Sequence, residues 1–243
     1  MYYRHRPSRA MHLADMTSAD FAKAVKPDTV VILPVGAVEA HGPHLPLSAD
    51  LIQPMAVAEE VANKTGAWIA PLIPYGLCVS TKPFPGTITP GFDSLRAYVR
   101  DILVDFHRNG VRHVLVITGH AGREHMAALR VAAQEAVAAT GLDVAVLSDY
   151  DLIYASKLVP KGDGHAGTVE TSRVMRLRPD LVKPLPKKAA NRLPKYTVVA
   201  DPRKHWAGVT GNPRRADVRL AKRLDAMIVR ELVKMVKAMA GSK

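Results

Sequence analysis

An unbroken apolar run, Val30–Val35, ends at Gly36 and most constrains what this chain can fold into. Such a run, without polar residues at every second position, is typical of a strand buried on both faces and hence of a parallel sheet. Further short apolar runs follow at 68–73, 114–118 and 144–147, separated by segments with helical spacing of apolar residues. This alternation predicts an α/β fold, with a mostly parallel central sheet and helices on both faces.

The length and composition predict a single domain over residues 1–243. Residues 1–16 are expected to form a loose N-terminal arm, and residues 180–215 a proline-rich, basic and irregular segment. The apolar runs are too short to span a bilayer, so no membrane association is expected. One cysteine, Cys78, excludes an internal disulfide. These features, with no secretory signal in the first 16 residues, predict a cytoplasmic protein.

The formal charge of +12 is concentrated in the last third of the chain. Residues 151–243 hold 21 lysines and arginines against 8 aspartates and glutamates. This excess fits a solvated surface or a face that meets an acidic partner surface in an oligomer. It also fits steering of an anionic substrate or nucleic acid. Aromatic residues make up only 5% of the chain and no basic run is interleaved with them, so nucleic-acid binding is not expected.

Metal-capable side chains follow the ends of two expected strands. The candidate ligands are Glu39, His41, Asp50, His120 and Glu170. Ligands in parallel α/β sheets lie beyond the carboxyl ends of the strands, which brings the groups after 30–35 and 114–118 to one edge. A single glutamate or histidine in a loop is usually a surface residue. Five candidates, however, exceed the three protein ligands of one catalytic zinc, whereas two metals that share a bridging carboxylate would use them all.

The segment Glu39-Ala40-His41-Gly42-Pro43-His44-Leu45-Pro46, followed by Asp50, resembles the signature of the creatininase (creatinine amidohydrolase) family. Later blocks resemble that family in the right order: Phe84-Pro85-Gly86-Thr87, Thr118-Gly119-His120, Asp163-Gly164-His165-Ala166-Gly167 with Glu170-Thr171-Ser172, and Gly208-Val209-Thr210-Gly211. The resemblance covers roughly residues 30–215. It implies a three-layer α/β/α fold, a binuclear metal centre, hydrolysis of C–N bonds in cyclic or linear amides, and a homo-oligomer, often a hexamer.

By the same resemblance, Glu39 and His120 would hold one metal, His41 would hold the other and Asp50 would bridge them. Zinc is the expected metal, with manganese and iron as alternatives. Gly122 stands where creatininase itself has a further metal-binding glutamate. Glu170 is the expected substitute, either as a metal ligand or as a residue that contacts the ligands. Two other departures concern the substrate: Ser80-Thr81-Lys82-Pro83 replaces a Glu-His pair of many relatives, and Thr118 stands where asparagine is common.

The expected mechanism is attack of a metal-bridging hydroxide on the amide carbonyl, with a metal polarising the carbonyl oxygen. His165, in a glycine-rich turn before a helix, is the expected general acid or base, and Glu170 is grouped with it as a catalytic residue. A purely structural turn is the other interpretation of His165. His44 is expected to support the ligands. Four further histidines are expected at surface or helix-end positions: His107, His113, His125 and His205.

The predicted function is therefore metal-dependent hydrolysis of a small-molecule amide, as in creatinine amidohydrolase. One alternative is a formamide deformylase that acts on a phosphorylated pyrimidine. An alternative of another class is a non-catalytic basic binding or assembly protein on the same fold. Metal content separates the enzyme from the binding protein.

Overall fold

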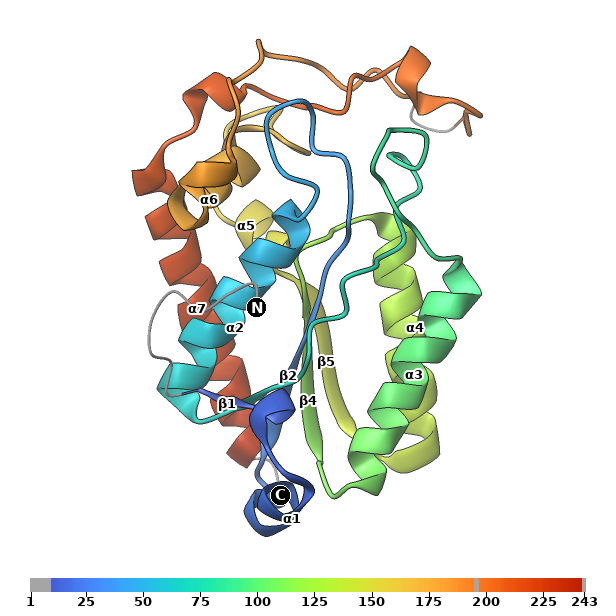
Figure 1. Cartoon of the computed structure of the whole chain (residues 1–243), viewed down its shortest axis with the longest axis vertical. Helices are drawn as coiled ribbons and strands as arrows, with labels where there is room; N and C mark the ends of the chain where they lie inside the picture. The colour runs from blue at the N-terminus through green and yellow to red at the C-terminus, as the bar shows by residue number, and fades with distance from the viewer. Residues whose placement is uncertain (1–9, 195–196, 242–243) are drawn as a thin grey trace.

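Five parallel strands form one central sheet, in the order β1-β3-β2-β4-β5, in the computed structural model, which describes residues 10–194 and 197–241 (Figure 1). The strands are β1 (Met11–His12), β2 (Val30–Val35), β3 (Trp68–Ile69), β4 (His113–Thr118) and β5 (Asp143–Ser148). Strand β2 pairs with β4 along its whole length, from Val30 opposite His113 to Val35 opposite Thr118. The two central strands therefore end side by side, which places the loops that follow them next to each other.

Helices cover both faces of this sheet and make three layers (Figure 1). One face carries α2 (Ala49–Thr65), α5 (Asp149–Ala155), α6 (Thr168–Leu177) and α7 (Val218–Gly241). The other face carries α1 (Ser18–Ala24), α3 (Phe92–Arg108) and α4 (Arg123–Thr140). Short 3-10 turns lie at Leu13–Asp15, Pro179–Leu181, Pro202–Lys204 and Pro213–Arg215. The α/β fold with helices on both faces of a parallel sheet is thus confirmed.

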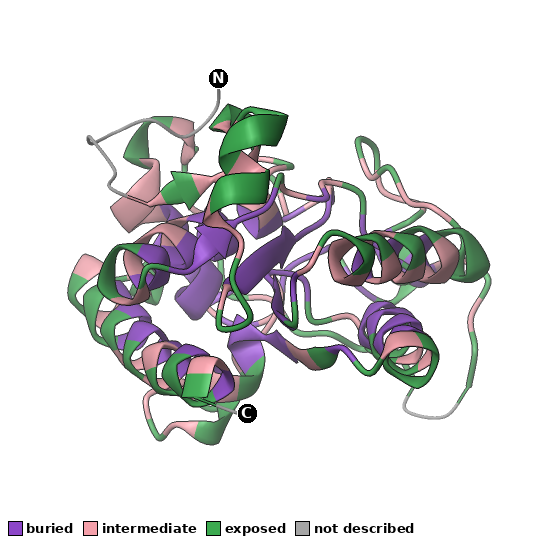
Figure 2. Cartoon of the chain, turned by 90° about the horizontal axis from the view of Figure 1, so that it is seen from below, coloured by how far each residue is buried: buried purple, intermediate pink, exposed green. Residues whose placement is uncertain are grey.

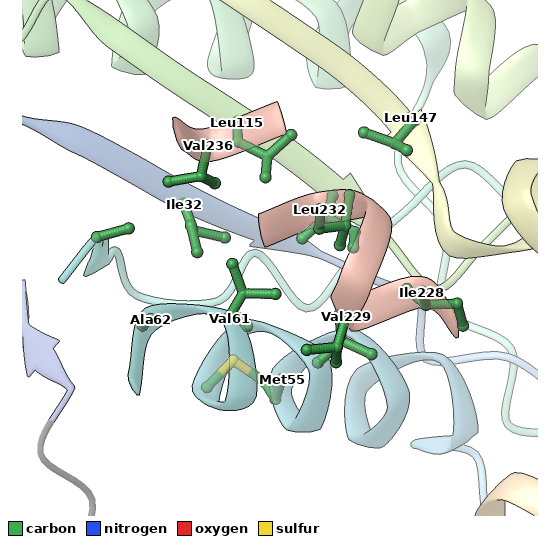
Figure 3. Close-up of a cluster of buried hydrophobic side chains, with 14 of the residues drawn as sticks. Ile32, Met55, Val61, Ala62, Leu115, Leu147, Ile228, Val229, Leu232 and Val236 are labelled. Carbon is green, nitrogen blue, oxygen red and sulfur yellow. The ribbon is translucent and has the colours of Figure 1, made fainter. Parts of the chain in front are cut away.

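The sheet divides the hydrophobic core in two, because successive side chains of a strand point to opposite faces. Ile32 of β2 packs with α2 and α7, in the cluster shown in Figure 3. Its neighbours Val31 and Leu33 pack instead among residues of α3 and α4. Figure 2 shows the buried strands enclosed between helices whose outer faces are exposed. Burial on both faces explains why β2 has no polar position.

Two details differ from the sequence-based expectation, whereas the irregular segment agrees with it. Residues 11–12, assigned to a loose arm, form the edge strand β1 beside β3, while residues 1–9 lie outside the described part. Helix α5 is not predicted by apolar spacing; a capping box of Ser148 and Asp151 starts it directly after β5. Within the described part of 180–215 the chain is largely irregular, with 3-10 turns and an isolated bridge between Ala189 and Gly211.

No helix of the described ranges is both long enough and apolar enough to cross a bilayer.

Two glycines let the first turn of α2 reach the edge of the sheet. Gly36 follows β2 and Gly119 follows β4, at neighbouring positions. A Cβ at Gly119 would lie 2.5 Å from the backbone oxygen of Asp50 and 2.7 Å from Cδ of Pro54, and a Cβ at Gly36 would collide with the same oxygen. The absence of side chains at these two positions therefore sets how close Asp50 lies to the ends of the central strands.

We expect Gly119→Ala to displace Asp50 and to lower the free energy of unfolding by about 1–3 kcal/mol, the usual cost of overpacking. The matched control is Gly91→Ala, because Gly91 has an ordinary φ of −75° and the nearest atom to its added Cβ is Oγ of Ser94, at 3.8 Å. The control should cost less than about 1 kcal/mol. Urea denaturation of both variants measures the difference. Equal stability would show that α2 can move away freely.

Candidate functional site

Five buried ionisable side chains meet beyond the carboxyl ends of β2 and β4. Glu39 and His41 lie in the loop after β2, and Asp50 lies in the first turn of α2. His120 follows β4, and Glu170 lies in the first turn of α6. Their exposed fractions are only 1–8%. The structure therefore brings together all five residues that the sequence analysis proposes as metal ligands.

Asp50 lies between the two histidines and contacts one with each carboxylate oxygen. Its Oδ1 is 3.1 Å from Nε2 of His41, and its Oδ2 is 3.1 Å from Nδ1 of His120. Oε2 of Glu170 lies 3.5 Å from the same His41 nitrogen, and Oε2 of Glu39 lies 2.9 Å from the same His120 nitrogen. The cluster thus has two halves, each with one imidazole and one carboxylate, joined by Asp50.

Both imidazoles are oriented by backbone carbonyls on the side away from this cluster. Nδ1 of His41 lies 3.0 Å from the carbonyl oxygen of Glu39, and Nε2 of His120 lies 3.1 Å from that of Leu77. A carbonyl only accepts, so each of these outer nitrogens donates its N–H. The inner nitrogens then carry a lone pair that points at carboxylates, unless a second proton or a metal ion lies between them.

In the metal-free protein, protons lie between the inner imidazole nitrogens and the carboxylates. Burial alone would lower the pKa of His41, but Asp50, Glu170 and Glu39 outweigh it and raise that pKa to about 10. Burial opposes protonation of His120 too, yet Glu39 and Asp50 raise its pKa well above the ordinary value. Conversely, burial would raise the pKa of Asp50, but the two imidazoles hold it well below its usual range. Burial raises the pKa of Glu170.

Three sets of side chains in this region place one donor atom each within 4.8 Å of one another and could hold a metal ion. They are Glu39, His41 and His165; Glu39, Cys78 and His120; and His41, Asp50 and Glu170. The last two sets correspond to the two halves of the cluster.

A cavity of about 800 Å³ opens over the cluster. His165 lines it, and its ring stacks on that of His41 with centroids 4.3 Å apart. Nε2 of His165 lies 2.8 Å from the carbonyl oxygen of Ala40, which fixes the ring.

Trp206 closes one side of the cavity, with its ring 5.1 Å from that of His165 and 5.8 Å from that of Phe84. Its indole N–H donates to the carbonyl of Val209, so Trp206 both packs and lines the cavity.

Some supporting residues are missing from the sequence-based set. Thr81 donates from its hydroxyl to Oε1 of Glu39 and fixes that carboxylate. His125 is fully buried: its Nδ1 accepts from the backbone N–H of Leu77, and its Nε2 lies 3.0 Å from Oγ1 of Thr118. Thr118 in turn accepts the backbone N–H of His120. His125 therefore lies at a helix end, in the first turn of α4, as expected, but it is buried and not on the surface.

Among the other histidines, His44 and His205 lie where they were expected, whereas His113 does not. His44 is buried and its Nε2 lies 2.9 Å from Oγ1 of Thr171, which joins the loop after β2 to α6 as a supporting residue should. His113, also expected at a surface or helix end, is buried at the start of β4, where Nδ1 lies 2.9 Å from Oδ2 of Asp143. That pair lies at the opposite end of the strands from the cluster. His205 is exposed, as expected.

Helix α6 is held so that Glu170 points into the cluster. Asp163 accepts the backbone N–H groups of Thr168 and Val169 and thereby caps the helix. Oε2 of Glu170 also accepts the N–H of Ala166, at 2.5 Å. One turn on, the fully buried Arg173 contacts Asp149 of α5, with Nη1 2.6 Å from Oδ2. Its Nε donates to Oδ1 of Asp225 of α7, at 2.7 Å.

Comparison with known proteins gives one consistent family. The family model described as creatininase, creatinine amidohydrolase, matches residues 14–236. The creatinine amidohydrolase of Pseudomonas putida is 31% identical over 72% of this chain and 75% of its own length. The mycofactocin precursor peptide peptidase of Mycobacterium tuberculosis (strain CDC 1551 / Oshkosh) is 29% identical over 97% of this chain and 94% of its own length.

Solved structures agree with the sequence comparison. A manganese form of creatininase has a TM-score of 0.87 and 26% identity, and covers 96% of this chain and 100% of its own. A Zn–Zn form of a creatininase mutant has a TM-score of 0.85 and 25% identity, and covers 97% of this chain and 100% of its own. Because the family model spans nearly the whole chain, and the fold matches over 96% of it, this protein belongs to the creatininase family of hydrolases.

Proposed function

We propose that this protein hydrolyses a C–N bond of a small amide with two divalent metal ions held by the five-residue cluster. The observation that carries the proposal is the pair of inner imidazole nitrogens, which face buried carboxylates from 2.9–3.5 Å. Burying three carboxylates is costly unless cations compensate them. Nitrogen and oxygen donors in this mixture suit zinc, manganese or iron, so the residues present fit the proposed ions.

In this proposal Glu39, Asp50 and His120 would hold one ion, while His41, Asp50 and Glu170 would hold the other. Asp50 would be shared, because its two oxygens face the two halves of the cluster. The carbonyls of Glu39 and Leu77 keep each imidazole in the tautomer that a metal needs. Gly122 stands where creatininase has a metal-binding glutamate, and we propose that Glu170 supplies that carboxylate here. Glu170 comes from the first turn of α6.

When bound, the metal ions would supply an activated water and polarise the amide carbonyl. His165 lines the cavity beside His41 and donates through Nε2 to the Ala40 carbonyl. Its Nδ1 is then left to take a proton from the attacking water and to pass it to the leaving nitrogen. Trp206 and Phe84 shield this side of the cavity from solvent.

The cavity lining favours an amide that carries an anionic group. Outside the cluster, the charged residues of the lining are Lys82, Arg123 and Glu124, and Lys82 belongs to the segment that departs from the family pattern. A phosphorylated or carboxylated substrate would gain from these cations. The formamide of a phosphorylated pyrimidine therefore stays a candidate substrate, together with creatinine-like amides. A peptide substrate, as named for the mycobacterial relative, is a further member of the test panel.

The decisive experiment measures metal content and turnover of the purified protein together. We expect close to two equivalents of zinc, manganese or iron, and hydrolysis of at least one compound among creatinine, small lactams, formamides and short peptides. Chelation should abolish turnover and the same metal should restore it. Protein that binds none of these metals at micromolar concentration, with no turnover, would instead support the binding-protein alternative.

Metal binding should depend steeply on pH. His41 and His120 both have a raised pKa in the metal-free protein, so each must lose a proton when an ion binds. Affinity should therefore rise with pH below about 10, the pKa of His41, and fall as pH decreases. Calorimetry in two buffers of different ionisation enthalpy should detect at least two protons released at pH 7. Release of none would mean that the imidazoles are not ligands.

His165→Gln should lower kcat by about 10²–10⁴-fold, the usual contribution of a general acid or base. Bound metal should stay unchanged, because His165 is outside the proposed ligand set. The matched control is His205→Gln, at an exposed histidine of the irregular segment 180–215. Full activity of the His165 variant would show that the histidine only packs against His41.

A further inference from the structure

The single cysteine of the chain lies inside the candidate metal site. Sγ of Cys78, the Glu39 carboxylate and a nitrogen of His120 all lie within 4.8 Å of one another, and all three residues are buried. Cys78 itself is 1% exposed. Its sulfur approaches the carbonyl oxygen of Gly76 at 3.7 Å, which is a weak contact.

The backbone on both sides of Cys78 is fixed by hydrogen bonds to the site. The N–H of Leu77 donates to Nδ1 of His125, and the carbonyl of Leu77 accepts from Nε2 of His120. The N–H of Cys78 donates to Oγ1 of Thr89, at 2.9 Å. These contacts hold the sulfur close to His120 on a preorganised loop, which is what a metal ligand requires.

A second observation points to a ligand at the same place. Oε2 of Glu39 is fully buried and has no hydrogen-bond partner among the described residues, although Nδ1 of His120 lies 2.9 Å away. The other oxygen, Oε1, is already held by Thr81. The Glu39 carboxylate, the thiol and a nitrogen of His120 therefore lie close enough together for one cation to contact all three.

We infer that Cys78 is a further ligand of the metal ion held by Glu39, Asp50 and His120; this rests on the proposed metal-dependent function. Binding would form an Sγ–metal bond and release the thiol proton to solvent. A thiolate beside nitrogen and oxygen donors makes this half of the cluster softer than the half at His41 and Glu170. The Cys78 half then prefers zinc or cobalt to manganese.

Cobalt substitution tests this directly, because the chain has one cysteine and any thiolate-to-cobalt charge-transfer band must come from Cys78. Metal-free protein is loaded with Co²⁺ and its absorption spectrum is recorded in the visible and near ultraviolet. We expect visible d–d bands together with a near-ultraviolet charge-transfer band. Cys78→Ser should keep the d–d bands, lose the charge-transfer band and reduce the preference for Zn²⁺ over Mn²⁺ by about tenfold or more.

The outcomes separate this inference from the proposed function. Bound cobalt with d–d bands but no charge-transfer band in the unmodified protein would overturn the role of Cys78 and leave the metal site standing. Failure to bind cobalt or any other divalent ion would overturn the proposed function itself. The unmodified protein alone gives this answer, so an unstable Cys78→Ser variant would not obscure it.

Discussion

Asp50→Asn should remove both metal ions and reduce kcat by about 10³-fold or more, the loss expected when several kcal/mol of metal-derived stabilisation of the transition state disappears. Asp50 contacts both imidazoles, His41 through Oδ1 and His120 through Oδ2. The amide of asparagine keeps the shape but loses the negative charge and presents an N–H₂ to one of the two sides. No other residue of the cluster touches both halves in this way.

The control for this variant is Asp143→Asn. Asp143 also contacts a histidine, His113, at 2.9 Å, but at the amino ends of β4 and β5. Its side chain is about half exposed, so loss of the pair should cost at most about 1 kcal/mol and leave metal content intact. Metal analysis and steady-state kinetics on both variants provide the measurement. Retention of two metals by the Asp50 variant would rule out a bridging carboxylate at this position.

Arg173→Met should lower the free energy of unfolding by about 3–5 kcal/mol, because it leaves a buried carboxylate without its cation. Arg173 is fully buried and contacts Asp149 and Asp225 from α6, so it joins α5, α6 and α7 through one side chain. Asp225 keeps a second partner in Arg176, whereas the only ion-pair partner of Asp149 among the described residues is Arg173. The uncompensated charge is therefore that of Asp149.

Arg130→Met is the matched control, because Arg130 contacts Asp151 at 3.7 Å with both side chains at least half exposed. Such surface pairs contribute at most about 1 kcal/mol. Chemical denaturation of the two variants measures the contrast. If Arg173→Met were as stable as the control, the buried network would not hold α6, and another contact would have to position Glu170.

The fold could be predicted because buried strands and helices have recognisable apolar patterns in the sequence. Strand β2 has the bounds that its apolar run predicts, and Gly66 ends α2 in the left-handed conformation expected of a helix-terminating glycine. The exceptions are short. Strand β1 has two residues and α5 has seven, so neither is long enough to show a periodic pattern.

The candidate metal ligands could be predicted from the sequence, but the residues that hold them in position could not. The candidate ligands are recognisable because they cluster after strand ends within a specific local pattern. Thr81 and His125 act through contacts to Glu39 and Leu77, which are 42 and 48 residues away in sequence. Nothing near Thr81 or His125 in the sequence indicates such a partner. The substrate, the ligand roles and the hexamer stay predictions.

The distribution of the cluster along the chain also has a kinetic consequence. Asp50 and His120 are separated by 70 residues, and Glu170 lies beyond a further strand and two helices, α4, β5 and α5. Parallel strands form their contacts late, since each pairing first requires a long crossover to close. Metal ions would therefore bind after the folding barrier has been crossed. They would lengthen the lifetime of the native state by slowing unfolding, and leave the rate of folding almost unchanged.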